Sequence, residues 1–127
     1  MTEWQLSELL YMTGYELNRG LSDEEAKAWL TLMIQAGNEL PMEKEHRMSI
    51  FDFCERAGLS YLDDDHAVGV TSSVLARLMD VSAWRADEAN TYRHAIVTWY
   101  GIEGETLRFC LAGAFLHKIL PFITRSN

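Results

Sequence analysis

The longest apolar stretch of the chain, residues 106–123 (TLRFCLAGAFLHKILPFI), constrains the fold more than any other segment. From Phe109 to Leu116 it contains no charged or strongly polar side chain, and the small residues at positions 112–114 have large apolar neighbours on both sides. A helix that is apolar nearly all round is usually buried on most of its faces. The stretch is therefore predicted to be the central core helix of a small domain.

The length of 127 residues fits one domain with one hydrophobic core, residues 1–127. The predicted fold class is mostly α, a single compact domain of about five or six helices. The chain does not open with a basic segment followed by an apolar one, so the sequence does not indicate a secretion signal. Charged residues interrupt the longest apolar run before it reaches the roughly 20 residues that span a bilayer. Cys54 and Cys110, each in an apolar segment, indicate buried free thiols and hence a reducing, cytoplasmic compartment.

Local signals predict three helices in the first half of the chain. Thr2 and Gln5 form a possible capping box for a helix from residue 3 to about 18. Ser22 and Glu25 form a second box, for a helix that reaches Gly37. A third, short helix is capped by the serine at position 49 and ended by the glycine at position 58.

The second half is less decisive. Residues 59–69 are expected to form a loop, after which Thr71 or Ser72 caps a fourth helix that breaks at residues 80–82. Residues 83–100 are predicted to form a fifth helix. The alternative is a small β-hairpin near residues 95–109, because residues 95–100 (AIVTWY) have strong β-propensity and residues 101–105 could turn the chain into a second strand.

Negative charge is concentrated in the first half. Residues 1–66 carry 14 Asp and Glu against 5 Lys and Arg, whereas residues 67–127 carry 5 against 6. Nucleic-acid affinity needs clustered cations, so this balance argues against direct nucleic-acid binding and against an anionic membrane. The acidic half is predicted to dock on a basic protein surface, with mere solubility as the alternative. The candidate contact residues are Asp23, Glu24, Glu43, Glu45, Asp63, Asp64 and Asp65, together with the aromatic Trp84, Trp99 and Tyr100.

No pattern indicates a catalytic, cofactor or metal site. The acidic run that ends at His66 lacks the glycine and glutamate of a calcium-binding loop, and no two histidines are four residues apart. Cys110 would need a raised thiolate fraction to act as a nucleophile, but its apolar flanks favour a buried, unreactive thiol.

Two segments resemble known families. Residues 72–88 (SSVLARLMDVSAWRADE) resemble a bacterial helix-turn-helix, in which Leu75-Ala76 and Val81-Ser82 match the family's spacing and Asp80 departs from its usual glycine. This resemblance implies a transcriptional regulator. Residues 109–114 (FCLAGA) are similar to a segment of small uncharacterised proteins of phages and other mobile elements, which implies a setting but no activity.

These observations predict a non-enzymatic, acidic binding protein that inhibits a basic, nucleic-acid-binding partner. The favoured version is a phage-type counter-defence inhibitor, such as an anti-CRISPR or anti-restriction protein. An immunity protein that neutralises a toxin nuclease fits the same charge pattern. A helix-turn-helix regulator is the next alternative, and a thiol enzyme based on Cys110 follows it. The sequence does not indicate an oligomeric state.

Overall fold

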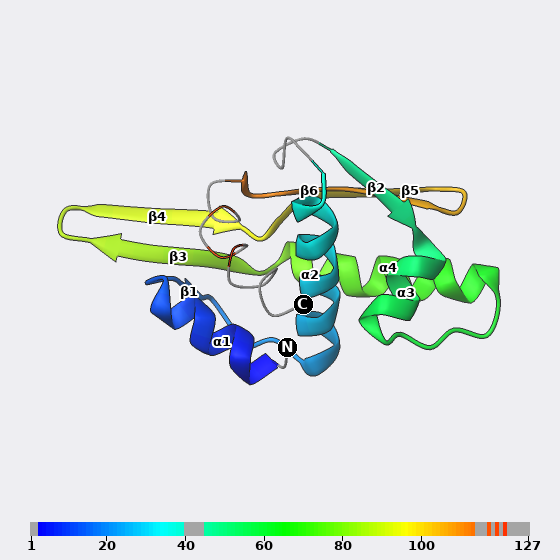
Figure 1. The fold of residues 1–127 in the computed structure, drawn as a ribbon, viewed down its shortest axis with the longest axis horizontal. Helices are drawn as coiled ribbons and strands as arrows, with labels where there is room; N and C mark the ends of the chain where they lie inside the picture. Colours follow the sequence, from blue (N-terminus) through cyan, green and yellow to red (C-terminus); the bar gives the residue numbers. More distant parts are fainter. Residues whose placement is uncertain (1–2, 40–44, 114–116, 118, 120, 122–127) are drawn as a thin grey trace.

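The computed structural model describes residues 3–39, 45–113, 117, 119 and 121, and combines helices with antiparallel sheets (Figure 1). In chain order the elements are α1 (Glu3–Met12), β1 (Glu16–Leu17), α2 (Asp23–Gly37), β2 (His46–Ser49), α3 (Ile50–Ala57), α4 (Asp64–Met79), β3 (Ser82–Asp87), β4 (Asn90–Ala95), β5 (Val97–Glu103) and β6 (Thr106–Leu111). The prediction of a mostly α fold is therefore wrong, and the protein is α+β.

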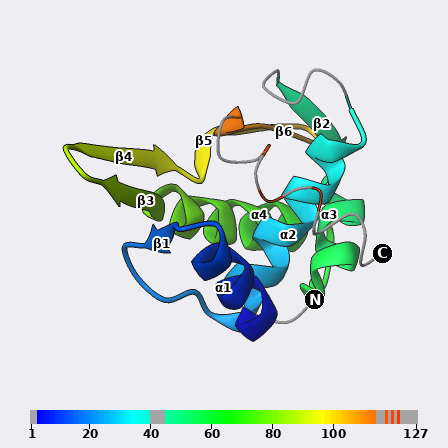
Figure 2. The same cartoon turned by 60° about the vertical axis from the view of Figure 1, so that its left-hand side comes forward.

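The strands form two three-stranded antiparallel sheets. The core sheet has the order β2-β6-β5, and the hairpin sheet has the order β1-β3-β4. Helices α2, α3 and α4 lie on one side of the core sheet, whereas β3 and β4 extend away from the helices as a long hairpin (Figures 1 and 2). The fold thus has a compact body and one projecting arm.

The hydrophobic core lies between the core sheet and the three helices. Most of the largest fully buried side chains come from these two layers, and Ile96 and Ile119 add to them: Trp29, Leu32, Met33, Ile50, Phe53, Leu75, Leu78, Ile96, Leu107, Phe109 and Ile119. Full burial of each such side chain contributes roughly 1.5–3 kcal/mol to the free energy of unfolding. This layer holds α4 against the sheet and leaves its opposite side in solvent.

The apolar stretch at residues 106–123 is not one central helix, because its first part is strand β6. Leu107, Phe109 and Leu111 are buried, while the alternate positions are partly exposed, which is the period-two pattern of a half-buried strand. Residues 113, 117, 119 and 121 are helical, and Ile119 is buried. Strand β6 pairs with β5 through a turn at Gly104, whose φ is +62°, so the alternative of a hairpin near residues 95–109 is the arrangement observed.

The helix predicted for residues 83–100 is also wrong. This segment contains β3, β4 and the start of β5, and the β3–β4 pairing runs from Ser82↔Ala95 to Asp87↔Asn90. The turn between the two strands includes Glu88 at a positive φ of 31°. The aromatic and β-branched side chains that fit one face of a helix fit the two faces of a strand pair equally well.

The predicted helix ends are confirmed where the capping residues are close to the helix end in the sequence. Ser22 and Glu25 form the predicted capping box, the side chain of Ser49 accepts hydrogen bonds from the start of α3, and Gly58 ends α3 at a φ of +71°. The loop predicted for residues 59–69 is correct for residues 59–63 but wrong for residues 64–69, because Asp63 caps α4 and the helix begins at residue 64. Helix α1 ends at residue 12 rather than about 18, since the chain turns at Gly14, whose φ is +84°; Thr2 lies outside the described residues.

None of the helices in the described part of the chain is both long enough and apolar enough to cross a membrane.

Candidate functional site

Helices α3 and α4 form a helix-turn-helix pair joined by residues 58–63. The buried face of α4 carries Ala67, Thr71, Val74, Leu75 and Leu78, which pack into the core. Residues 72–88, which resemble a helix-turn-helix in sequence, do not form two helices. The first part of this segment is the second half of α4, and the last part is strand β3. The pair that the structure shows begins at residue 50.

The solvent side of α4 borders an open groove of about 500 Å³. The groove is lined by Glu24, Leu59, Ser60, His66, Gly69, Ser73 and Arg77, among others. Arg77 is the cation of this groove, and its guanidinium is paired with the carboxylate of Glu24. The pairing leaves little positive charge for a ligand on this side of α4.

The beginning of α4 is acidic. Asp63 caps the helix through a hydrogen bond of 2.8 Å from the backbone N–H of His66, and Asp64 and Asp65 are exposed in the first turn. At the same end of the molecule as drawn in Figure 1, the β5–β6 turn carries Glu103 and Glu105. We call this region, residues 63–65 with residues 103 and 105, the acidic end.

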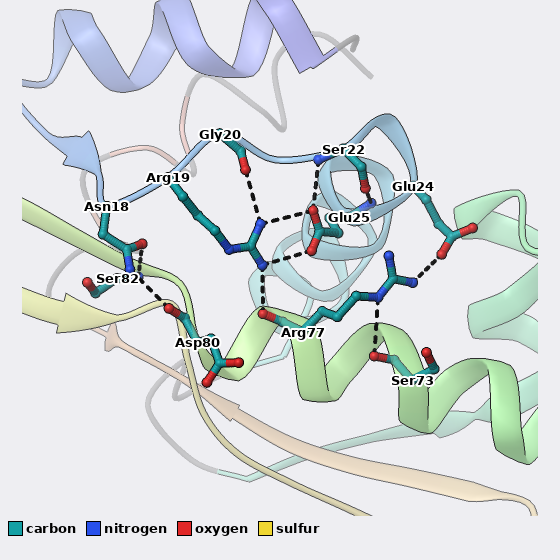
Figure 3. A network of polar contacts seen from close by, with 10 residues as sticks. All are labelled: Asn18, Arg19, Gly20, Ser22, Glu24, Glu25, Ser73, Arg77, Asp80 and Ser82. Carbon is teal, nitrogen blue, oxygen red and sulfur yellow. Dashed lines mark hydrogen bonds and ion pairs between the residues drawn. The ribbon is translucent and has the colours of Figure 1, made fainter.

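A polar junction of Asn18, Arg19, Glu25 and Arg77 joins the α1–α2 connection to the end of α4 (Figure 3). The guanidinium of Arg19 donates to both carboxylate oxygens of Glu25, at 3.1 and 2.8 Å, and to the carbonyl oxygen of Arg77 at 2.9 Å. The carboxamide of Asn18 donates to the carbonyl of Asp80 and accepts from the backbone N–H that starts β3. This junction therefore binds the chain at the point where α4 ends and β3 begins.

The β3–β4 hairpin carries a cation held between aromatic rings. The guanidinium carbon of Arg85 lies 5.4 Å from the ring centroid of Tyr15 and 5.1 Å from that of Tyr92. These distances are in the range of cation–π contacts. On the opposite face, Trp84 and Arg93 are cross-strand partners. The hairpin therefore presents an arginine on each of its faces.

The predicted contact residues do not form one surface. Asp23 and Glu24 lie in the first turn of α2, where they pair with Lys27 and Arg77, and Asp63, Asp64 and Asp65 start α4. Glu45 pairs with Arg108 beside the core sheet, and Glu43 lies outside the described residues.

The three predicted aromatic residues are also separated. Trp99 is 42% exposed on the core sheet, with the guanidinium carbon of Arg108 at 5.5 Å from its ring centroid. Trp84 lies on the hairpin sheet, and the hydroxyl of Tyr100 contacts the hydroxyl of Ser72 on α4 at 3.3 Å. The nine predicted residues that the structure describes are spread over several elements, and whether any of the ten binds a partner stays a prediction.

The two thiols differ in their surroundings. Cys54 is fully buried, with its Sγ atom 3.3 Å from the hydroxyl of Thr71. Cys110 is half-buried rather than buried as predicted, and burial raises the pKa of its thiol. Among the described residues, no group of three or more His, Cys, Asp or Glu side chains is placed to hold a metal ion.

Sequence reasoning missed the two arginines of the hairpin. Arg85 and Arg93 both lie in residues 83–100, which were predicted to form a helix. The signal that identifies this region is local: residues 90–95 (NTYRHA) combine strand-forming residues with hydrogen-bond donors and contain no carboxylate. The helical spacing of the aromatic residues obscured it.

Comparison with solved structures identifies a similar fold. The chain is similar to the WH1 domain of MSBI1.176, a replication protein isolated from a multiple sclerosis patient, with a TM-score of 0.57 and 13% sequence identity over 94% of this chain and 88% of that chain. No protein-family model matches the sequence. No curated protein matches it either. A replication-protein neighbour is consistent with the resemblance to mobile-element proteins, whereas nothing in it points to an anti-CRISPR or other inhibitor.

The order of elements agrees with this likeness. Helix α2, strand β2, helices α3 and α4 and the hairpin β5–β6 follow one another, and β2 pairs with β6. The β3–β4 hairpin lies between α4 and β5. The fold is winged-helix-like.

Proposed function

We propose that this chain is a duplex-DNA-binding domain of the winged-helix type that replication proteins contain. The observation that carries the proposal is the shared fold with a replication-protein WH1 domain over 94% of the chain. The α3–α4 pair is consistent with it, because DNA-binding domains of this type contain a pair of helices joined by a short turn. The proposed activity is binding and includes no catalytic step.

The test is a binding titration of the purified chain with a short fluorescent DNA duplex, read by anisotropy. We expect binding that weakens as salt rises from about 50 to about 200 mM, since each neutralised phosphate releases counterions and adds about 0.9 to the negative slope of log K against log salt. A single strand of the same sequence serves as the comparison ligand. Absence of duplex binding at about 50 mM salt would contradict the proposal.

A second candidate function is contact with a basic protein surface through the acidic end. The specific observation is Leu62, which is 91% exposed directly beside Asp63, Asp64 and Asp65. An exposed apolar side chain next to carboxylates suits a protein partner, because apolar contact supplies affinity and complementary charge directs association.

A further inference from the structure

The arginines in the described part of the chain are of two kinds, those that pair with another side chain and those that do not. Arg19, Arg47, Arg77 and Arg108 each pair with a glutamate, and Arg56 donates to the amide oxygen of Gln35. Within the described residues, Arg85 and Arg93 have no carboxylate at ion-pair distance. The charge of these two side chains is therefore available to an anionic ligand, and both lie on the projecting hairpin.

Strand β4 adds further hydrogen-bond donors. It is an edge strand, since the hairpin sheet has the order β1-β3-β4, and all of its side chains except the half-buried His94 are exposed. Asn90, Thr91 and Tyr92 are neutral donors next to Arg93. Arginine, threonine, asparagine, tyrosine and free backbone N–H groups are the groups that usually contact DNA phosphates.

Arg85 is held in position without an acceptor. Its Nε atom is buried and makes no hydrogen bond with the described part of the chain. The rings of Tyr15 and Tyr92 hold the guanidinium instead, and an added Cβ at Gly14 would lie 3.6 Å from the Cδ atom of Arg85, so the stem is packed as well. A cation whose orientation is set by aromatic contacts loses little conformational entropy when it binds a phosphate.

The surfaces that a winged-helix protein most often turns to DNA carry the wrong charge here. Glu103 at the β5–β6 turn pairs with Arg108. Glu105 in the same turn, and Asp64 and Asp65 in the first turn of α4, have exposed carboxylates. These carboxylates repel phosphates, and the guanidinium of Arg77 is already paired with Glu24. The acidic end thus disfavours docking of DNA on the beginning of α4.

From these contacts we infer that the β3–β4 hairpin contacts the phosphate backbone of duplex DNA. Arg93 and the other exposed donors of β4 make the contact, and Arg85 on the opposite face of the hairpin contributes its positive charge. The inference rests on the proposed DNA-binding function and names the surface that performs it. Because phosphate contacts carry no base information, the hairpin supplies affinity and orientation rather than sequence recognition. The acidic turn residue Glu88 places the contact along the side of β4, not at the tip of the hairpin.

Arg93→Ala tests the inference, with Arg47→Ala as the matched control. Both are exposed arginines on edge strands, but Arg47 lies on the core sheet and pairs with Glu45. In the anisotropy titration we expect Arg93→Ala to lower the salt slope by about 0.9 and to weaken duplex binding several-fold, whereas Arg47→Ala leaves both unchanged. Arg93→Lys keeps the charge and should restore most of the affinity.

Arg85→Ala should have the same direction of effect, and a thermal melt of each variant checks that the hairpin sheet still folds. Wild-type binding with equal affinities for Arg93→Ala and Arg47→Ala would overturn the inference and leave the proposed function standing. No duplex binding by the wild type would overturn both. A loss of self-association in Arg93→Ala, measured by sedimentation without any change in duplex binding, would assign the β4 edge to a second copy of the chain and overturn the inference.

Discussion

At Glu25, one carboxylate serves both as a helix cap and as the centre of the polar junction. It accepts hydrogen bonds from the backbone N–H of Ser22 at 2.8 Å and from both terminal nitrogens of Arg19, and its side chain is only 5% exposed (Figure 3). The hydrogen bonds from Arg19 lower its pKa from 4.5 to about 2, against the opposing effect of burial. The charged form is therefore part of the folded structure.

Glu25→Gln is expected to lower the free energy of unfolding at neutral pH by about 1–3 kcal/mol, because it leaves the guanidinium of Arg19 with a weaker acceptor. The pKa of Glu25 is lower in the folded than in the unfolded protein, so its stabilisation is complete above about pH 4.5 and is lost as the pH falls toward about 2. Urea titrations between neutral and acidic pH should show the gap between variant and wild type closing over this range. Asp23→Asn is the control, since its exposed pair with Lys27 is worth only a few tenths of a kcal/mol. A gap that does not change with pH would contradict the assignment.

At the scale of elements, the sequence was most informative where structure depends on a few neighbouring residues. The box of Ser22 with Glu25 and the left-handed Gly58 identified the ends of α2 and α3 correctly. The strands could not be identified in the same way, because a strand such as β6 is stabilised by pairing with β2, some 60 residues away in the chain. Helix α4 was misjudged at its beginning because Gly69 and the β-branched residues around it weaken helix propensity, and tertiary packing overrides that weakness.

Gly58 and Gly69 lie on either side of the start of α4, and we expect substitution by alanine to have opposite effects at the two positions. Gly58→Ala should destabilise the fold by about 1–2 kcal/mol, since an L-residue at a φ of +71° is strained even though the added Cβ meets only the Cδ atom of Lys27 at 4.0 Å. Gly69→Ala should stabilise it by about 0.5–1 kcal/mol, because Gly69 is inside α4 and its added Cβ meets nothing within 4 Å. Chemical denaturation of both variants measures the difference. Destabilisation by Gly69→Ala would mean that α4 is not a continuous helix at this position.

At the scale of the whole molecule, the candidate site was only partly accessible from the sequence. The sequence singled out Asp63, Asp64 and Asp65, which are exposed, but it assigned them to a loop and not to the start of a helix. Counting charges by halves of the chain hid the pairing of Glu24, Glu25 and Glu45 with arginines, which removes much of the apparent negative field. The charge count also gave no sign that Arg85 and Arg93 have no carboxylate partner among the described residues, because only the fold determines which charges lie close together.

The separation of the two ends leads to a last prediction, for the double variant Asp64→Asn with Asp65→Asn. Helix α4 has 16 residues and therefore a length of about 24 Å, so its acidic start lies well beyond the Debye length of roughly 8 Å from the end that leads into the hairpin. If DNA contacts the β3–β4 hairpin, removing these two charges should change duplex affinity at physiological salt by less than about twofold. If DNA docks on the start of α4, affinity should rise several-fold and the salt slope should steepen, which would count against the hairpin.

The same variant should weaken binding of any basic protein that docks on the acidic end, mainly through a slower association rate, because complementary charge acts on the encounter more than on the bound complex. Anisotropy with duplex DNA and association kinetics with the basic partner, measured on one preparation, therefore distinguish the two ends.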